Sequence, residues 1–266
     1  MSSLIEQAAQ RLEQLRQAGI EVPELESAPH EKPAGMEWPS AAASAAVEQD
    51  SWAPSARPQV MSGVSSVEAL QKSRKIELDL AMLATTGIVT PDAPRTHMAD
   101  QYRVIKRPLI SNAMGKGASK LEHGNLIMVT SALSGEGKSF TSINLAMSIA
   151  SELDHTVMLV DADVARPSVL NVLGLPPGPG LLEILEGKAD VASTLLRTNV
   201  DKLTLLPSGT PHPKATELLA SDAMANLLND LATRYPDRIV IFDSPPLLLT
   251  TESRVLATNM GQIVVV

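Results

Sequence analysis

The sequence of 266 residues contains no cysteine and very few aromatic residues. The absence of cysteine excludes disulfide bonds and thiolate metal sites, and it suits a reducing compartment such as the cytoplasm. Only two Phe, two Tyr and two Trp occur, so surfaces that stack the bases of single-stranded nucleic acids are not expected. A formal net charge of -8 is also unfavourable for binding a polyanion. We therefore expect no nucleic-acid partner.

Long apolar runs are missing as well. No run approaches the roughly 20 residues that a transmembrane helix needs, and the N-terminus lacks a basic segment followed by an apolar one. We therefore expect a cytoplasmic protein with no transmembrane segment of its own. Hydrophobic residues still make up 44% of the chain, which is enough for a sizeable, mostly aliphatic core.

The first 72 residues differ in composition from the rest of the chain. Residues 1–20 carry a capping-box pattern and apolar residues at helical spacing, which predict a short amphipathic helix. Residues 21–72 are rich in Pro, Ala and Ser and too poor in apolar residues to fold alone, so they predict a disordered linker. Residues 73–266 are expected to form one domain. That domain is expected to be incomplete at its C-terminus, because the sequence ends on an apolar strand pattern at residues 263–266.

The stretch from Leu126 to Ala150 predicts a strand, a phosphate-binding loop and a helix. An apolar run at residues 126–130 is interrupted by two glycines, after which apolar residues return at helical spacing. The loop approximates the pattern G-x-x-x-x-G-K-[ST], with Ala132 in place of the first glycine. Glycines let backbone amides surround a phosphate, the lysine meets the terminal phosphates, and the serine hydroxyl ligates magnesium. The alternative is a turn that only caps an ordinary helix. The candidate nucleotide-binding residues are Ser134, Gly135, Glu136, Gly137, Lys138, Ser139 and Phe140.

Acidic residues follow two other strand patterns. Val157–Asp161 and Ile239–Asp243 are apolar runs that end in Asp, and Asp163 lies just beyond the first of them. Helix-like stretches separate the strands, which predicts an α/β fold: a P-loop NTPase-like sandwich with a mostly parallel sheet and helices on both faces. The carboxyl ends of parallel strands meet at one edge, so Asp161, Asp163 and Asp243 are expected beside the phosphate loop. There they could bind Mg²⁺ and accept a proton from an attacking hydroxyl, although a single such Asp could equally cap the next helix.

The remaining patterns are less specific. Residues 76–84 fit a strand and a helix equally well, and residues 100–107 look helical until Pro108, which is expected to end that helix. A short helix, a strand and further helical structure are expected over residues 181–185, 203–206 and 216–234. One region is basic in this acidic chain, and it is either a solvated helix face or a contact with an acidic neighbour, another subunit or an anionic membrane surface. Its residues are Arg103, Lys106, Arg107, Lys116 and Lys120.

Together these motifs resemble those of the bacterial tyrosine kinases of exopolysaccharide systems, a branch of the MinD/ParA-like P-loop ATPases. Residues 130–139 are similar to the family's Walker A motif, and residues 157–167, which end in Arg-Pro, to its Walker A′ motif. Residues 239–246, with Asp-Ser-Pro-Pro, are similar to its Walker B motif. Residues 102–109 further resemble the form associated with exosortase-linked polysaccharide loci. The resemblance covers roughly residues 75–266.

The resemblance implies an ATP- and Mg²⁺-dependent protein tyrosine autokinase that regulates polysaccharide export. It implies that Lys138 contacts the β- and γ-phosphates and that Ser139 ligates magnesium. Asp161 and Asp163 would divide the roles of catalytic base and metal ligand, and which of them is the base is left open. Asp243 would hold magnesium through water.

The resemblance also implies partners. The family's E-x-x-R-x-x-R helix, which packs subunits into a ring, is matched in degenerate form by Asp100, Arg103 and Lys106. We therefore expect a homo-oligomer, together with a membrane-bound polysaccharide chain-length (co-polymerase) protein that holds it at the inner membrane. The family's tyrosine-rich tail has no counterpart, because only Tyr102 and Tyr235 occur, and the tail and the adenine pocket are expected beyond the given sequence.

Two other functions remain open. A MinD/ParA-like ATPase switch usually carries an extra lysine near the start of the phosphate loop, and residues 132–136 contain none, which favours the kinase. An adaptor whose nucleotide domain only docks partners is the third possibility. Magnesium-dependent nucleotide binding would argue against the adaptor.

Overall fold

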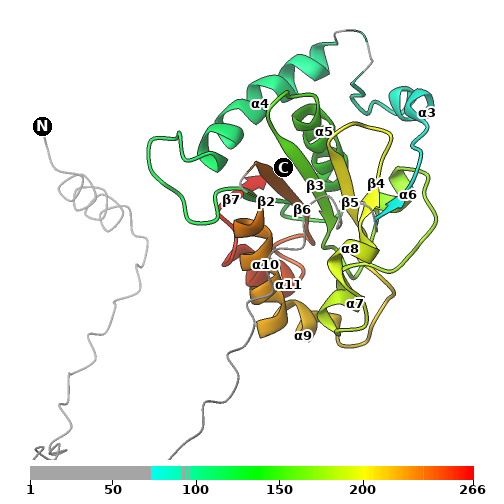
Figure 1. The fold of residues 1–266 in the computed structure, drawn as a ribbon, viewed down its shortest axis with the longest axis vertical. Helices are drawn as coiled ribbons and strands as arrows, with labels where there is room; N and C mark the ends of the chain where they lie inside the picture. The colour runs from blue at the N-terminus through cyan, green and yellow to red at the C-terminus, as the bar shows by residue number, and fades with distance from the viewer. Residues whose placement is uncertain (1–72, 92–93, 95, 236) are drawn as a thin grey trace, which may run out of the picture. The chain divides into compact units, whose positions relative to one another are not determined.

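A computed structural model describes residues 73–91, 94, 96–235 and 237–266, which form a seven-stranded sheet with helices packed against it (Figure 1). The helix expected over residues 1–20 and the linker expected over 21–72 lie outside the described residues. Among the described strands, β4 and β5 pair antiparallel and the other pairs are parallel. The strands are β1 (Arg74–Lys75), β2 (Leu126–Thr130), β3 (Thr156–Asp161), β4 (Leu196–Arg197), β5 (Leu203–Leu206), β6 (Arg238–Asp243) and β7 (Gln262–Val265), in the order β1-β4-β5-β3-β6-β2-β7.

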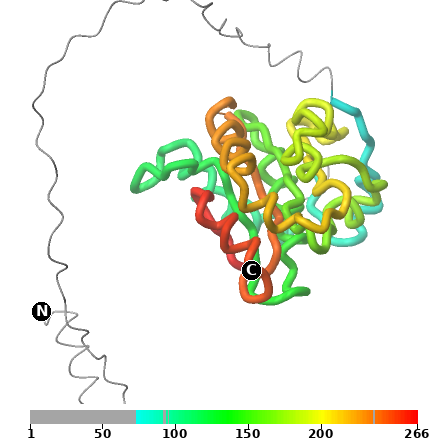
Figure 2. The backbone as a smooth tube through the Cα atoms, turned by 90° about the horizontal axis from the view of Figure 1, so that it is seen from below, coloured from blue at the N-terminus to red at the C-terminus, as the bar shows by residue number. Residues whose placement is uncertain are grey.

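Helices cover both faces of the sheet because side chains alternate along the strands. In β2, Ile127 and Val129 belong to a hydrophobic cluster shared with α4 (His97–Ala113) and α5 (Lys138–Ala150). Leu126 and Met128 belong to a second cluster with α7 (Leu181–Leu185), α10 (Asp222–Arg234) and α11 (Glu252–Ala257). Figure 2 views the domain from below, with α10 in orange in front of the strands. The described helices are α3 (Leu80–Thr85), α4 (His97–Ala113), α5 (Lys138–Ala150), α6 (Val169–Val172), α7 (Leu181–Leu185), α8 (Val191–Thr194), α9 (Ala215–Leu219), α10 (Asp222–Arg234) and α11 (Glu252–Ala257).

Most of the expected elements are confirmed. The bounds of β2, β5 and α7 are those predicted from the sequence, β3 and β6 begin one residue earlier than predicted, and β7 is shifted by one residue at both ends. The helical stretch expected over 216–234 is two helices, because the Ser221 hydroxyl caps a new helix by accepting a hydrogen bond from the Met224 amide. The mostly parallel sheet with helices on both faces is likewise as expected.

The structure resolves one open choice and corrects one prediction. Within residues 76–84 the chain becomes helical at α3, whose N-cap Asp79 accepts a hydrogen bond from the Met82 amide at 2.9 Å. The prediction that Pro108 ends its helix is wrong, because α4 continues to Ala113. Pro108 is exposed and Val104 is 73% exposed, so the Val104 carbonyl that loses its helical partner can bond to water.

No helix within the described ranges combines the length and the apolar content that crossing a membrane requires.

Candidate nucleotide and metal site

Three neighbouring strands end at the candidate site. β6 lies between β2 and β3, and its register pairs Asp243 with Asp161 at the end of β3. On its other side Asp243 is paired with Val129 of β2, so the loop that follows β2 begins beside both carboxylates. The parallel arrangement of the strands therefore brings the phosphate loop and the two acids to one edge of the sheet.

The phosphate loop, residues 131–137, has a backbone shape suited to an anion. Gly135 and Gly137 have φ angles of 90° and 99°, in the left-handed region that favours glycine. Gly137 is also the N-cap of α5, so the positive end of this helix lies at the loop. The Leu133 amide donates a hydrogen bond to Glu136 Oε2 at 2.8 Å, which closes the turn.

Two further residues of the expected nucleotide site point in different directions. Ser134 is exposed on the loop. The Phe140 ring instead packs against the hydrophobic cluster on the α5 face, and a Cβ built at Gly87 would lie 3.6 Å from this ring. Packing therefore turns the Phe140 ring toward the hydrophobic cluster, although Phe140 also lines an open pocket with Glu136 and Gly137.

Lys138 and Asp163 form an ion pair at the centre of the site. Lys138 Nζ lies 2.7 Å from Asp163 Oδ2, and the two side chains are only 12% and 4% exposed. An ion pair so little exposed is weakly screened by salt. Phosphate oxygens bound in the loop would compete with Asp163 for the same ammonium group.

Asp161 and Asp243 are buried, and each keeps one oxygen without a partner. The amides of Ser168 and Val169 donate to Asp161 Oδ2 at 3.1 and 3.0 Å, and the Ser142 hydroxyl donates to Asp243 Oδ1 at 3.1 Å. Asp161 Oδ1 and Asp243 Oδ2 have no hydrogen-bond partner among the described residues. Buried polar atoms are seldom left unpaired, so these two oxygens point to a missing ligand.

Burial also perturbs the protonation of these acids. It raises the pKa of Asp161 to about 7, and the charge of Asp243 adds to this increase. Burial raises the pKa of Asp243 too, while a hydrogen bond with Ser139 and the charge of Lys138 act in the opposite direction. Carboxylates that resist ionisation when the site holds no cation would ionise readily beside one.

Two serines of the site were not expected from the sequence. Ser142 lies one helical turn after Lys138 and contacts Asp243, and the Ser168 hydroxyl donates a hydrogen bond to Ser139 Oγ at 2.7 Å. The helical spacing of Ser142 from Lys138 was a usable signal. No spacing rule connects Ser168 with Ser139, because the contact depends on how the chain turns after β3.

The donor set fits a magnesium ion. Mg²⁺ prefers oxygen ligands and keeps several waters, so it needs few protein side chains. Within the described part of the chain, no three His, Asp or Glu side chains converge as a direct metal cage. The hydroxyl of Ser139 beside the unpartnered oxygens of Asp161 and Asp243 instead suits an ion held by one hydroxyl, by phosphates and by waters.

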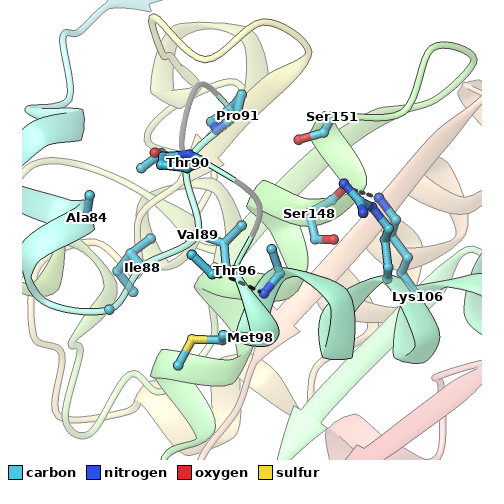
Figure 3. Close-up of a pocket in the computed structure, with 14 residues that line it drawn as sticks. Ala84, Ile88, Val89, Thr90, Pro91, Thr96, Met98, Lys106, Ser148 and Ser151 are labelled. Atoms are coloured by element: carbon cyan, nitrogen blue, oxygen red, sulfur yellow. Dashed lines mark hydrogen bonds between the residues drawn. The ribbon is translucent and has the colours of Figure 1, made fainter.

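The residues expected to contact another subunit do not share one environment. Asp100 and Arg103 are exposed on α4 and form an ion pair at 2.8 Å. Lys106 is only 3% exposed, and its Nζ lies 2.8 Å from Glu152 Oε1. The same Nζ donates a hydrogen bond to the Ser148 carbonyl (Figure 3). Lys106 therefore joins α4 to α5 within this chain, and it does not stand on the exposed face with Arg103.

A cavity of about 550 Å³ lies away from the phosphate loop, between the loop at residues 87–91, α4 and α5 (Figure 3). Ile88, Val89 and Met98 give it an apolar lining, and Lys106 and Ser148 lie at one side. None of the candidate phosphate or metal ligands lines it. We therefore assign the chemistry to the sheet edge and not to this cavity.

Comparison with known proteins agrees with the geometry. The sequence model of the ParA family, described as NUBPL iron-transfer P-loop NTPase, matches residues 122–192. The tyrosine-protein kinase YwqD of Bacillus subtilis is 32% identical over 188 residues, which cover 71% of this chain and 73% of that protein. The putative tyrosine-protein kinase EpsB of Ralstonia nicotianae is 33% identical over 210 residues, which cover 76% of this chain but only 26% of EpsB. The crystal structure of the chimerical protein CapA2B2 has a TM-score of 0.57 and 26% identity, covering 72% of this chain and 78% of that one.

Proposed function

Because the chain belongs to the family of bacterial tyrosine-protein kinases, we propose that it transfers the γ-phosphate of ATP to tyrosine side chains of proteins, its own copies included. The observation that carries this proposal is the pair of buried carboxylate oxygens without partners, Asp161 Oδ1 and Asp243 Oδ2, beside a lysine and a serine of a phosphate loop. Such an arrangement supplies cation binding, phosphate binding and proton acceptance in one place.

Phosphate binding is assigned to the loop and to Lys138. The backbone at Gly135 and Gly137 and the positive end of α5 would surround the phosphates, with Ser134 and Glu136 on the rim of the loop. Lys138 would leave Asp163 for the β- and γ-phosphates and offset charge on the transferred group. Magnesium, held by Ser139 and by Asp243 through water, would neutralise phosphate charge when bound.

Asp161 is the better candidate for the proton acceptor. Its Oδ2 is fixed by two backbone amides while Oδ1 is unpartnered, and burial raises its pKa to about 7. Beside a bound cation this carboxylate would be ionised and could accept a proton. The tyrosine O–H proton would pass to Asp161 Oδ1 as the phenolic oxygen attacks the γ-phosphorus and the bond to ADP breaks. Asp163 would serve as the counter-ion of Lys138 until the phosphates arrive.

The partners follow from the same family. The longer relatives, among them the succinoglycan biosynthesis transport protein ExoP of Rhizobium meliloti, carry the matching region as 18–26% of their length. We infer a role in exopolysaccharide export beside a membrane-bound chain-length protein, with this chain at the cytoplasmic side of the membrane. A homo-oligomer would use the exposed part of α4, where the ion pair of Asp100 and Arg103 is followed by Val104 and Ile105, which are 73% and 41% exposed.

The test is incubation of the purified protein with γ-labelled ATP and Mg²⁺, with and without an added tyrosine-containing polypeptide. We expect labelled phosphotyrosine, and we expect Lys138→Met to reduce it at least about 100-fold because charge stabilisation of the transferred group is lost. Lys188→Met is the matched control, since Lys188 is exposed and pairs only with Glu186 among the described residues. Label found only as free phosphate would overturn the kinase in favour of an ATPase switch.

A further inference from the structure

Ser168 joins two parts of the proposed site that the strands alone leave separate. Its hydroxyl donates a hydrogen bond to Ser139 Oγ at 2.7 Å, and its backbone amide donates to Asp161 Oδ2 at 3.1 Å. Ser139 belongs to α5, which follows β2, while Asp161 ends β3. One residue therefore contacts both the candidate magnesium ligand and the candidate base.

The Ser168 hydroxyl does not cap the helix that Ser168 begins. Ser168 is the N-cap residue of α6, a position where a serine hydroxyl usually accepts a hydrogen bond from a helix amide. Its hydroxyl makes no such bond. The Asp161 carboxylate accepts from the amides of Ser168 and Val169 instead, so the hydroxyl is left for Ser139. Ser168 is also half-buried, so packing alone does not dictate this contact.

The bond from Ser168 determines which part of the Ser139 hydroxyl remains available to a metal ion. A serine hydroxyl has one proton to donate and two lone pairs to accept with. Ser139 also acts on the Asp243 carboxyl, since its hydroxyl lowers the pKa of that group. The Ser168 proton occupies one lone pair of the Ser139 oxygen. The second lone pair is left for a metal ion, and the bond from Ser168 restricts rotation of the Ser139 hydroxyl.

We propose that Ser168 is a positioning residue for magnesium: it holds the Ser139 hydroxyl in the orientation that ligates the ion and fixes the Asp161 carboxylate through its backbone amide. It acts through Ser139 and Asp161 and does not touch the substrate. The inference rests on the proposed function, because it requires a magnesium–nucleotide site at this edge of the sheet. Residues that orient a metal ligand typically change metal affinity 10- to 100-fold when they are replaced.

The experiment measures binding of a fluorescent ATP analogue to the full chain during a Mg²⁺ titration and, separately, in EDTA. In Ser168→Ala the Mg²⁺ concentration at half-maximal effect is expected to rise about tenfold. Affinity in EDTA and the unfolding temperature without Mg²⁺ should stay at the wild-type values, because the backbone bond to Asp161 is kept. Ser168→Thr, which keeps the hydroxyl, should restore the Mg²⁺ dependence. Ser221→Ala, at the N-cap of α10, is the matched control and should leave it unchanged.

The possible failures are distinguishable. Wild-type Mg²⁺ dependence in Ser168→Ala would overturn the positioning role and leave the proposed function intact. An equal loss of affinity with Mg²⁺ and in EDTA would also overturn it, since Ser168 would then contact the nucleotide itself. A wild-type protein that binds the nucleotide analogue without any response to Mg²⁺ would overturn both the proposed site and this inference.

Discussion

Buried ionisable side chains occur in two regions of the domain, and only in one of them does every charged group have its partners. Between α4 and α5, Lys106 is 3% exposed and has both a carboxylate partner, Glu152, and a carbonyl partner, Ser148. At the sheet edge, Asp161 and Asp243 are 1% and 0% exposed, and each has an oxygen that no described residue contacts. The two regions share burial and differ in whether the charge is satisfied.

This difference separates a structural charge from a functional one. A buried charge with its partners in place costs little, and removing one partner destabilises the fold. A buried acid with an unpartnered oxygen lowers stability whenever it ionises, and this cost is recovered only when a cation binds. Lys106 therefore stabilises the fold, while Asp161 and Asp243 are the residues that we propose for cation binding and catalysis.

The largest expected effect is a pH dependence of stability that comes from Asp161. The folded pKa of about 7 lies above the unfolded value of 3.8, so between these values the folded state holds a proton that the unfolded state has released. Stability is therefore greater at low pH and is lost as pH rises toward 7. Without nucleotide or Mg²⁺, the free energy of unfolding should fall by about 3 kcal/mol between pH 5 and pH 8, since the titration spans about two pH units.

Denaturant unfolding in EDTA, followed by circular dichroism, measures this loss, and Asp161→Asn should remove most of it. The window avoids interference from Glu152, Glu183 and Glu252, whose pKa values are lowered and which therefore change stability only at more acidic pH. Asp154→Asn, at an exposed position, is the control and should keep the wild-type slope. If Asp161→Asn kept the wild-type dependence on pH between pH 5 and pH 8, Asp161 would ionise freely and the contrast between the two regions would be wrong.

A smaller effect on stability is expected between α4 and α5, where the buried charge of Lys106 has its partners. Lys106→Met should lower the free energy of unfolding by about 2 kcal/mol, because the buried Ser148 carbonyl loses its donor and Glu152 loses its ion pair. The loss is moderate because the Glu152 side chain is 23% exposed and can be hydrated. Unfolding in urea at pH 7.5 measures it.

Lys116→Met is the matched control, since Lys116 is an exposed lysine in the same basic region. It should change stability by less than about 0.5 kcal/mol. If the two variants behaved alike, the buried pair would contribute nothing, and Lys106 would be free to serve another subunit.

The sequence predicted the sheet edge better than the environment of Lys106 on α4. Apolar runs ending in Asp161 and Asp243 are local patterns, and the carboxyl ends of parallel strands meet at one edge of a sheet. The proximity of these residues could therefore be predicted from the sequence. The burial of Lys106 could not be predicted, because its partners Ser148 and Glu152 lie more than 40 residues away in the sequence. The charge of a lysine by itself favours an exposed position. Ser168 was missed for the same reason: its contact with Ser139 depends on how separate loops meet in space.

The continuation of α4 through Pro108 has a related cause. A proline disfavours the helical conformation in the residue before it and removes one amide donor, which is why the helix was expected to end. In the fold, Tyr102 and Lys106 are buried on one side of the proline, and Leu109 and Ile110 pack against the core on the other. Tertiary packing therefore holds both halves of the helix in line, at the local cost of the backbone hydrogen bond that Pro108 cannot donate.

The smallest expected effect tests that local cost. Pro108→Ala restores an amide that can donate to the Val104 carbonyl, and it should raise the free energy of unfolding by about 1 kcal/mol. The gain is smaller than the ~3 kcal/mol that a proline costs in a free helix, because alanine also gives the unfolded chain more conformational freedom. Urea unfolding of the single variant at pH 7.5 measures it.

Gln101→Ala, at another exposed position of α4, controls for the effect of alanine itself and should change stability by less than about 0.5 kcal/mol. The double variant Lys106→Met/Pro108→Ala extends the test. If α4 is held mainly by its anchor on α5, the restored hydrogen bond should recover part of the stability lost with Lys106, because a helix without its anchor depends more on its own backbone bonds. A loss of stability in Pro108→Ala would mean that the proline itself fixes the course of α4, and that Lys106 follows from that course and does not set it.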